Sequence, residues 1–241
     1  MKKINIKLIK TVAFLSILLC VLSSCAKKPK TDSELYNTAV IDAMIAEPQE
    51  IMPLVCVSKD EKLISWKDDR VLMLTMHKYP DSYPESKPVT LSFGNSWTFT
   101  DKEMKAWYDK NKTGVTDWSK RLQQLLGTEP HKTYTHISAF WTKPEDIRRP
   151  AYQIDATKQI EPKDLDGSSL GELHSWFCDN IISSYYIGEK KYPWTRLGYT
   201  YDWNDNKTAY GLTEFLVLKN ASVQVEFTKT IPEFIEWLEN Q

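Results

Sequence analysis

Strand-like and helix-like segments follow one another along this chain in an irregular order, and this order restricts the fold most strongly. Segments rich in β-branched and aromatic residues come in groups, and helical patterns do not separate every two of them. Because a doubly wound parallel sheet requires regular alternation, this order disfavours it. We predict the α+β class, with a mostly antiparallel sheet covered by several helices. The predicted strands are residues 51–57, 62–66, 70–77, 89–93, 97–100, 134–141, 214–218 and 223–227.

Capping boxes mark the expected starts of three helices. In a capping box a Ser or Thr side chain caps the first turn, and an acidic side chain three residues later reaches back to the cap amide. Other helices are expected over 33–46 and 116–126, the latter ended by Gly127 as a left-handed cap. One helical turn is expected at 144–147, and hairpin turns at 94–95 and 219–220. The three capping boxes begin at Thr100, at Ser169 (a helix to about residue 186) and at Thr230.

The N-terminal segment has the pattern of a bacterial lipoprotein signal peptide. A lysine-rich start precedes the apolar stretch 12–22, which is too short for a bilayer that needs about 20 apolar residues. Residues 22–25 read Leu-Ser-Ser-Cys and match a lipobox. We predict that 1–24 is the signal peptide, that Cys25 is lipidated, that 25–33 is a tether, and that 34–241 is one globular α+β domain. The alternatives are an ordinary secretory peptide cut nearby and an uncleaved anchor.

This N-terminus predicts a location in the bacterial cell envelope, with the domain outside the cytoplasm. Acyl chains on Cys25 would anchor the chain to a lipid bilayer, at about 0.8 kcal/mol per buried methylene. Removing 1–24 takes four of the 31 basic residues and none of the 32 acidic ones, so the mature chain is mildly acidic. Without a basic stripe, nucleic acid is a disfavoured partner.

Two cysteines remain for the folded part of the chain, Cys56 and Cys178, once Cys20 is removed and Cys25 is lipidated. In an oxidising compartment these two could form a disulfide. The alternative is a pair of buried thiols that act as small hydrophobic side chains.

Common catalytic and metal-binding motifs are missing from the sequence, and we predict neither a cofactor nor a metal. His131 and His136 are five residues apart, which places them on opposite faces of a strand. His174 and Cys178 lie four apart on a predicted helix and can touch. They share their face with apolar side chains, which favours a buried structural thiol over a nucleophile.

Aromatic residues are densest at 192–203, where five of twelve residues are Tyr or Trp. Such side chains offer rigid contact area for sugar rings or peptide backbones. A second candidate region is the Pro-rich loop after the strand 70–77, because loops at strand ends often carry function. Alternatively, the aromatic residues plug the end of the sheet, with Arg196 paired to Asp202. The candidate ligand-binding residues are His77, Tyr83, Trp194, Arg196, Tyr199, Tyr201, Asp202 and Trp203.

Five sequence segments resemble a group of uncharacterised secreted bacterial proteins and lipoproteins. The most specific are PWTRLGYTYDW at 193–203 and GLTEF at 211–215, joined by 77–83, 97–100 and 141–146. The resemblance covers about residues 70–240. It implies a single domain and an extracytoplasmic location, and it carries no catalytic or binding residues.

Three functions are compatible with this sequence. We favour a non-catalytic, membrane-anchored binding or accessory lipoprotein, whose ligand is a glycan, peptidoglycan or a peptide. The second is an envelope hydrolase that uses His77, Asp81 or Asp202 as acid/base groups. The third is a structural or antigenic surface lipoprotein with a packed aromatic segment. Exposure of Trp194 and Trp203 would separate the first from the third.

Overall fold

The computed structural model describes residues 29–188, 191–205 and 208–241. Within these ranges, Asp32–Gln241 form one compact unit. Its first helix starts at Asp32, inside the segment predicted to be the tether. Cys25 and the predicted signal peptide lie outside the described residues. No helix in the described ranges is long and apolar enough to cross a membrane.

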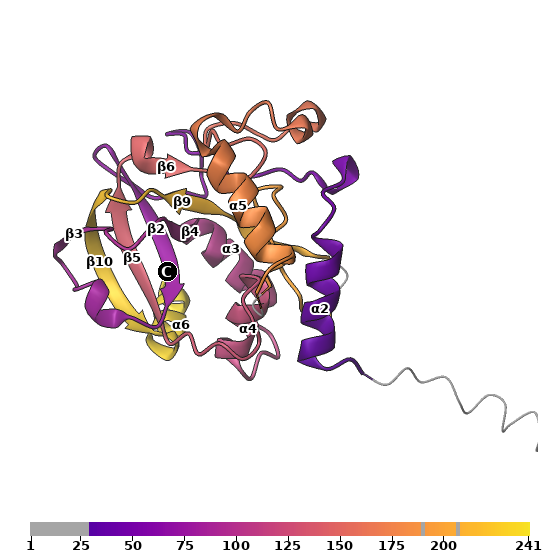
Figure 1. Ribbon diagram of the computed structural model, residues 1–241. Coiled ribbons are helices and arrows are strands. Elements are labelled where there is room, and N and C mark those ends of the chain that lie inside the picture. The colour runs from indigo at the N-terminus through magenta and orange to yellow at the C-terminus, as the bar shows by residue number, and fades with distance from the viewer. Residues whose placement is uncertain (1–28, 189–190, 206–207) are drawn as a thin grey trace, which may run out of the picture. The chain divides into compact units, whose positions relative to one another are not determined.

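One antiparallel sheet of eight strands dominates the described residues (Figure 1). Its strand order is β3-β10-β5-β2-β4-β9-β6, with β1 paired to β2. A two-stranded sheet joins β7 (Tyr199–Tyr201) to β8 (Tyr210–Thr213). The predicted α+β class is therefore confirmed. The strands of the large sheet are β1 (Trp66–Lys67), β2 (Arg70–His77), β3 (Pro88–Thr90), β4 (Ser96–Thr100), β5 (His136–Thr142), β6 (Ile147–Arg148), β9 (Phe215–Val217) and β10 (Ser222–Thr230).

The central strand β2 is apolar on both sides because both faces of the sheet are covered. It pairs with β5 along its length, from Val71 opposite Thr142 to His77 opposite His136. Side chains alternate between the faces, so Leu72 and Leu74 enter one core and Val71 and Met73 the other. This explains why 70–77 is a continuous apolar segment rather than an alternating one.

Helices pack on the first of these faces. The core there joins Leu72 and Leu74 of β2 to Met104, Leu122 and Phe234 from three helices. Full burial of such a side chain contributes about 1.5–3 kcal/mol. These helices are α3 (Asp101–Asn111), α4 (Trp118–Leu125) and α6 (Ile231–Glu239).

A separate core lies between the remaining helices and the aromatic segment. It contains Tyr36 of α2 (Asp32–Asp42), Phe177 of α5 (His174–Tyr185), Trp194 and Trp203. Figure 1 shows α2 and α5 on the side of the molecule away from β3 and β10. The aromatic segment is thus the packing partner of two helices.

Two predicted strands are wrong. Residues 51–57 are irregular, and of 62–66 only the last residue lies in a strand. The amides of 54–57 do bond, but to other partners: Leu54 to the Gln159 side chain, Val55 to the Thr213 hydroxyl and Val57 to the Ala156 carbonyl. Because side chains and a loop satisfy this backbone, its apolar residues are buried without strand pairing.

Both predicted hairpins are also wrong. β3 pairs with β10, whereas β4 pairs with β2 and β9, and β10 lies between β3 and β5. The chain does turn at both sites, but the turns bond to each other. Leu91 N–H donates to Ala221 O, Asn220 N–H donates to Leu91 O, and Lys219 N–H donates to the Asn95 side chain. This contact directs the strands on either side to different neighbours.

The capping box at Thr230 is confirmed, and the other two are wrong. Thr230 and Glu233 cap α6 reciprocally. Thr100 precedes α3, but its hydroxyl makes no hydrogen bond within the described residues, because Glu103 is buried against Thr213 instead. The Ser169 hydroxyl donates to Asp164, and a 3₁₀ turn precedes α5. The expected left-handed Gly127 (φ 64°) and the turn Pro144–Asp146 are present.

Candidate functional site

The aromatic segment at 192–203 does not form an exposed patch, and its side chains pack against other parts of the molecule, as in the alternative of a packed aromatic segment. Trp194, Tyr199 and Trp203 are 5%, 6% and 2% exposed, and Tyr201 is half-buried. The expected pairing of Arg196 with Asp202 is also absent.

The polar tips of these aromatic side chains bond to the surrounding protein. Trp194 Nε1–H donates to Pro150 O at 2.9 Å, and Trp203 Nε1–H donates to Thr128 O at 2.9 Å. The Tyr199 hydroxyl donates to Glu50 O at 3.1 Å, and the Tyr201 hydroxyl donates to Asp42 Oδ2 at 2.8 Å. With their polar atoms occupied, these side chains present mainly ring carbons to their other neighbours.

Arg196 and Asp202 each bond to a different part of the molecule. Asp202 forms a buried two-point ion pair with Arg121 of α4, at 3.0 and 2.5 Å. Arg196 has a left-handed backbone (φ 60°), donates to Ala43 O at 2.6 Å and stacks on Tyr185. Both residues therefore tie the aromatic segment to helices.

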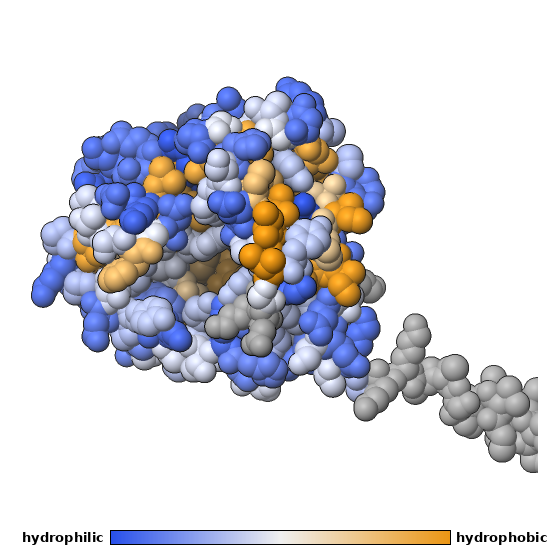
Figure 2. Space-filling model, in the orientation of Figure 1, coloured by the Kyte–Doolittle hydropathy of each residue, from blue (hydrophilic) through white to orange (hydrophobic). Residues whose placement is uncertain are grey.

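A cavity of about 490 Å³ lies beside this segment, in a hollow whose depth shows hydrophobic side chains in Figure 2. Of the predicted ligand-binding residues, Tyr83, Trp194, Tyr199 and Tyr201 line it, while His77, Arg196, Asp202 and Trp203 do not. The other lining residues are Thr75, Met76, Asn95, Ser96, Trp97, Thr98, Phe99, Leu126, Gly127, Thr128, Lys132, Tyr134, Asn180, Ser184, Tyr192, Pro193, Thr200 and Glu214.

The cavity opens where two neighbouring strands separate. β2 and β4 pair only at Met73 with Thr100 and at Leu74 with Phe99. The next pair in this register would be Thr75 with Thr98, but both of these residues line the cavity. Thr98 pairs with Phe215 of β9 instead. The splitting of the sheet thus creates the space, and the aromatic segment and α5 close it from the other side.

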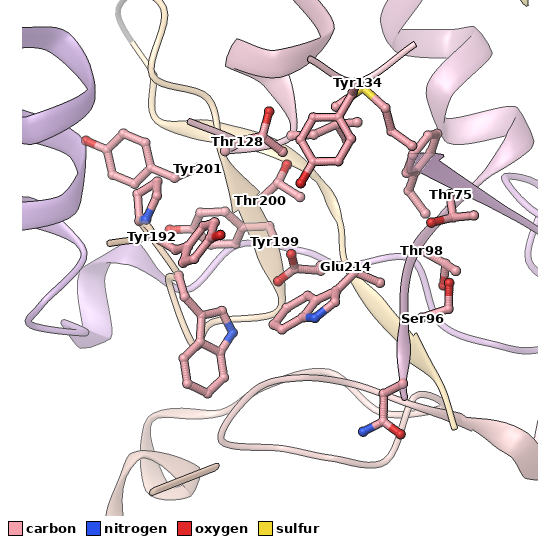
Figure 3. A pocket seen from close by; sticks show the side chains of 18 of the residues that line it. Thr75, Ser96, Thr98, Thr128, Tyr134, Tyr192, Tyr199, Thr200, Tyr201 and Glu214 are labelled. Carbon is pink, nitrogen blue, oxygen red and sulfur yellow. The ribbon is translucent and has the colours of Figure 1, made fainter. Parts of the chain in front are cut away.

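Glu214 is the acidic residue of the described cavity wall, and its side chain projects into the centre of the cavity in Figure 3. Its neighbours on both sides, Thr213 and Phe215, are buried, and its backbone N–H donates to Gly198 O at 2.9 Å. Within the described residues its carboxyl group has no hydrogen-bond or ion-pair partner. Desolvation by burial therefore raises the pKa of Glu214 to about 8.

Most other polar groups on the wall already have protein partners. The Thr200 hydroxyl donates to Leu125 O and accepts from Leu212 N–H. The Thr98 hydroxyl donates to Phe215 O at 3.3 Å. Lys132 donates to the Tyr192 hydroxyl and lies 4.4 Å from the centre of that ring. Glu214 is thus the ionisable side chain of the described wall for which no hydrogen bond or ion pair is present.

His77 is part of a buried hydrogen-bond chain outside the cavity lining. Its Nδ1 accepts from Tyr79 N–H at 3.1 Å, which places the ring proton on Nε2, the donor to Ser138 Oγ at 2.7 Å. Ser138 then donates to Thr228, which donates to Tyr83 O. Burial, followed by the neighbouring His136, lowers the pKa of His77 to about 4.

This geometry does not support the hydrolase hypothesis. A general base must accept the proton of its serine, whereas His77 donates to Ser138, and Ser138 is fully buried. Asp81 is exposed, and Asp202 is paired with Arg121. None of His77, Asp81 and Asp202 lines the cavity.

The remaining candidate groups are not brought together. Cys56 and Cys178 are both free, so the disulfide is not formed. His174 and Cys178 are exposed, and the expected buried thiol at Cys178 is therefore wrong. In the part of the chain that the structure describes, no group of three or more His, Cys, Asp or Glu residues could hold a metal ion.

Glu214 and Trp97 are the site residues that sequence reasoning missed. The apolar string Leu212-Thr213-Glu214-Phe215-Leu216 contains one acid, and an acid inside a buried strand is itself an indication of a special environment. Trp97 belongs to the segment 97–100, whose pattern indicates a strand and no binding role. No pattern could have shown that these two residues meet the aromatic segment.

Comparison with known proteins gives no match of sufficient similarity among family models, curated proteins or solved structures. The resemblance to secreted proteins and lipoproteins therefore stays a prediction, and the site's chemistry must carry the functional argument.

Proposed function

We propose that this chain is a non-catalytic binding lipoprotein of the bacterial cell envelope, and that its ligand occupies the cavity between β2, β4 and the aromatic segment. The observation that carries the proposal is the cavity itself, with aromatic walls and one unpartnered carboxyl group in the described residues. Its volume of about 490 Å³ falls within the range of small-molecule sites. Glycan, peptidoglycan and peptide fragments remain the proposed ligand classes.

The composition of the wall favours binding over catalysis. Hydrolysis of a glycosidic bond commonly uses two carboxyl groups that flank the bond, and the described wall holds only Glu214. Aromatic faces supply contact area at little entropic cost, because each ring has only two side-chain torsions. In this proposal the aromatic segment forms part of the wall of a cavity, whereas the sequence suggested a ligand-binding loop on the outer surface.

A substitution at the exposed edge of the cavity tests whether the ligand binds there. Trp97 lines the cavity and is 37% exposed, so Trp97→Ala should fold normally. Tyr79→Ala is the matched control, since Tyr79 is 62% exposed and does not line the cavity. In a screen of glycans, muropeptides and peptides, we expect Trp97→Ala to weaken the parent's binding by about tenfold or more. Equal weakening by both variants, or by neither, would contradict the placement.

The anchor is tested separately. Cys25→Ala should abolish incorporation of labelled palmitate and move the protein from the membrane fraction to the soluble fraction, because the acyl chains supply the anchoring free energy. Persistence of the variant in the membrane fraction would contradict lipid anchoring.

A structural or antigenic surface lipoprotein is the second candidate. The observation in its favour is that Trp194 and Trp203 are buried, with their indole N–H groups bonded to the backbone. It predicts that no ligand in the screen responds to Trp97→Ala.

A further inference from the structure

We propose that the cavity binds an organic cation, whose ammonium group pairs with Glu214 and packs against the surrounding aromatic rings. This inference rests on the proposed function and names the chemical class of its ligand. It follows from the arrangement of Glu214, Tyr199, Trp194 and Trp97 around one space.

Glu214 supplies the pairing group. A carboxyl group removed from water without a hydrogen-bond partner destabilises a protein, and such groups are normally paired or hydrogen-bonded. The nearby Glu103 shows this rule, because it accepts from Thr213 N–H at 3.0 Å and from the Thr213 hydroxyl at 2.9 Å. Glu214 is the next residue along from Thr213, faces the cavity, and has no such partner in the described residues. A ligand cation would supply the missing partner.

The rings supply the second part of the recognition. Trp194 and Trp97 lie 6.2 Å apart at 90°, so the two indoles form a corner rather than a flat stack. The polar atoms of Trp194 and Tyr199 are bonded to backbone carbonyls, so these two side chains contribute ring carbons to the cavity lining. Ring faces carry negative partial charge and attract cations, Trp most strongly. Figure 3 shows Glu214 beside Tyr199, with the carboxyl group directed into the cavity.

The lysine on the wall contacts two tyrosines rather than Glu214. Lys132 donates to the Tyr192 hydroxyl and lies 5.9 Å from the centre of the Tyr134 ring. No ion pair joins Lys132 to Glu214 in the described residues. A neutral sugar could stack on the same rings, but it would leave Glu214 without a charge partner.

Proton linkage gives a characteristic dependence on pH. With its pKa raised to about 8, Glu214 is mostly protonated at pH 7 in the free protein. A cation favours the carboxylate form, so its binding at pH 7 should release nearly one proton. The affinity should increase as the pH rises toward 8 and should level off above it, because the carboxyl group is then already ionised.

The experiment compares choline with 3,3-dimethyl-1-butanol, which has the same shape without the charge. Binding to the full-length chain in detergent is measured by calorimetry in buffers of different ionisation enthalpy, and by tryptophan fluorescence. We expect choline to bind about tenfold more tightly or better, with proton release. Glu214→Gln should reduce this preference to near unity and abolish the proton release, with binding of the neutral analogue unchanged. Glu236→Gln, on the exposed side of α6, is the control and should behave like the parent.

Each other outcome overturns a defined part of the proposal. Equal affinities for the two probes would overturn cation recognition, while binding of both would leave the cavity as a binding site. A charge preference that survives in Glu214→Gln would place the cation elsewhere. If neither probe binds at millimolar concentration, cation recognition fails, and the response of Trp97→Ala in the ligand screen decides the proposed function by itself.

Discussion

Two adjacent residues, Thr213 at the end of β8 and Glu214 between β8 and β9, show how strongly a shift of one position changes the environment of a side chain. Successive side chains of an extended chain point in opposite directions. Thr213 faces inward to Glu103, whose pKa burial raises to about 7 despite the hydrogen bonds from Thr213. Glu214 faces the cavity, where burial is the cause of its raised pKa. Burial therefore raises the pKa of both Glu103 and Glu214, but only Glu103 has hydrogen bonds from Thr213 that oppose this rise.

The unpartnered carboxyl group predicts a pH dependence of stability. The pKa of Glu214 is about 8 in the folded chain and about 4.3 when unfolded. The folded state therefore binds more protons between these values, and its stability falls as the pH rises through this window. Glu214→Gln should remove the share of this loss that Glu214 causes, which is about 5 kcal/mol at most, while Glu103 keeps its own share. Urea unfolding at pH 5 and pH 9 checks it: a parent and a variant with the same pH slope would contradict the assignment.

At the scale of elements, local patterns predicted where helices occur better than how strands pair. The helix starts near Asp101 and Ile231 were anticipated, although only Thr230 caps its helix as expected. The strand pairs were not, because pairing depends on contacts between turns distant in sequence, such as Leu91 with Ala221. Apolar segments such as 51–57 resemble strands in composition, but side chains satisfy their backbone.

Thr230 and Thr100 precede α6 and α3, and we expect substitution of their hydroxyl groups to affect stability differently. The Thr230 hydroxyl accepts from Glu233 N–H, so Thr230→Ala should lower the free energy of unfolding by about 1 kcal/mol. The Thr100 hydroxyl is buried without a partner in the described residues, so Thr100→Val should leave stability unchanged or raise it. Both are measured by denaturant unfolding. A comparable loss in Thr100→Val would show that its hydroxyl has a stabilising partner.

Gly211 in β8 has no room for a side chain, because the backbone of neighbouring segments lies close to it. A Cβ atom there would lie 2.5 Å from Leu125 O and 2.6 Å from Thr200 O, so Gly211→Ala must displace backbone. We expect a loss of about 3 kcal/mol or more in unfolding free energy. Gly114→Ala is the comparison: its φ of 80° carries strain, but no atom lies within 4 Å of the new Cβ. A smaller loss in Gly211→Ala than in Gly114→Ala would contradict the packing.

At the scale of the whole molecule, the fold class could be predicted because it depends on the order of elements. The cavity could not, because its walls come from segments as distant in sequence as Thr75, Trp97, Tyr199 and Glu214. The aromatic segment was recognised from composition alone. Composition does not distinguish an outer surface from an inner wall, and the hydrogen bonds of Trp194 and Tyr199 decide that question.

The buried ion pair between α4 and the aromatic segment predicts a connection between stability and the site. Asp202→Asn leaves the Arg121 guanidinium buried without its charge partner, which should cost about 3 kcal/mol or more. Because Tyr201 and Thr200 precede Asp202 and line the cavity, ligand affinity should fall as well. Asp109→Asn, in an exposed pair with Lys105, should change neither quantity measurably. Thermal unfolding and fluorescence titration check both, and equal effects of the two variants would contradict this connection.

The place of β10 in the sheet has a consequence for the order in which the sheet can form. β10 lies between β3 and β5, and α6 directly after it fills the helix-side core with Phe234 and Leu238. The sheet therefore cannot be completed before β10 is available, because β3 and β5 both pair with it. The strand order therefore makes completion of the sheet a step that depends on contacts between residues distant in the sequence.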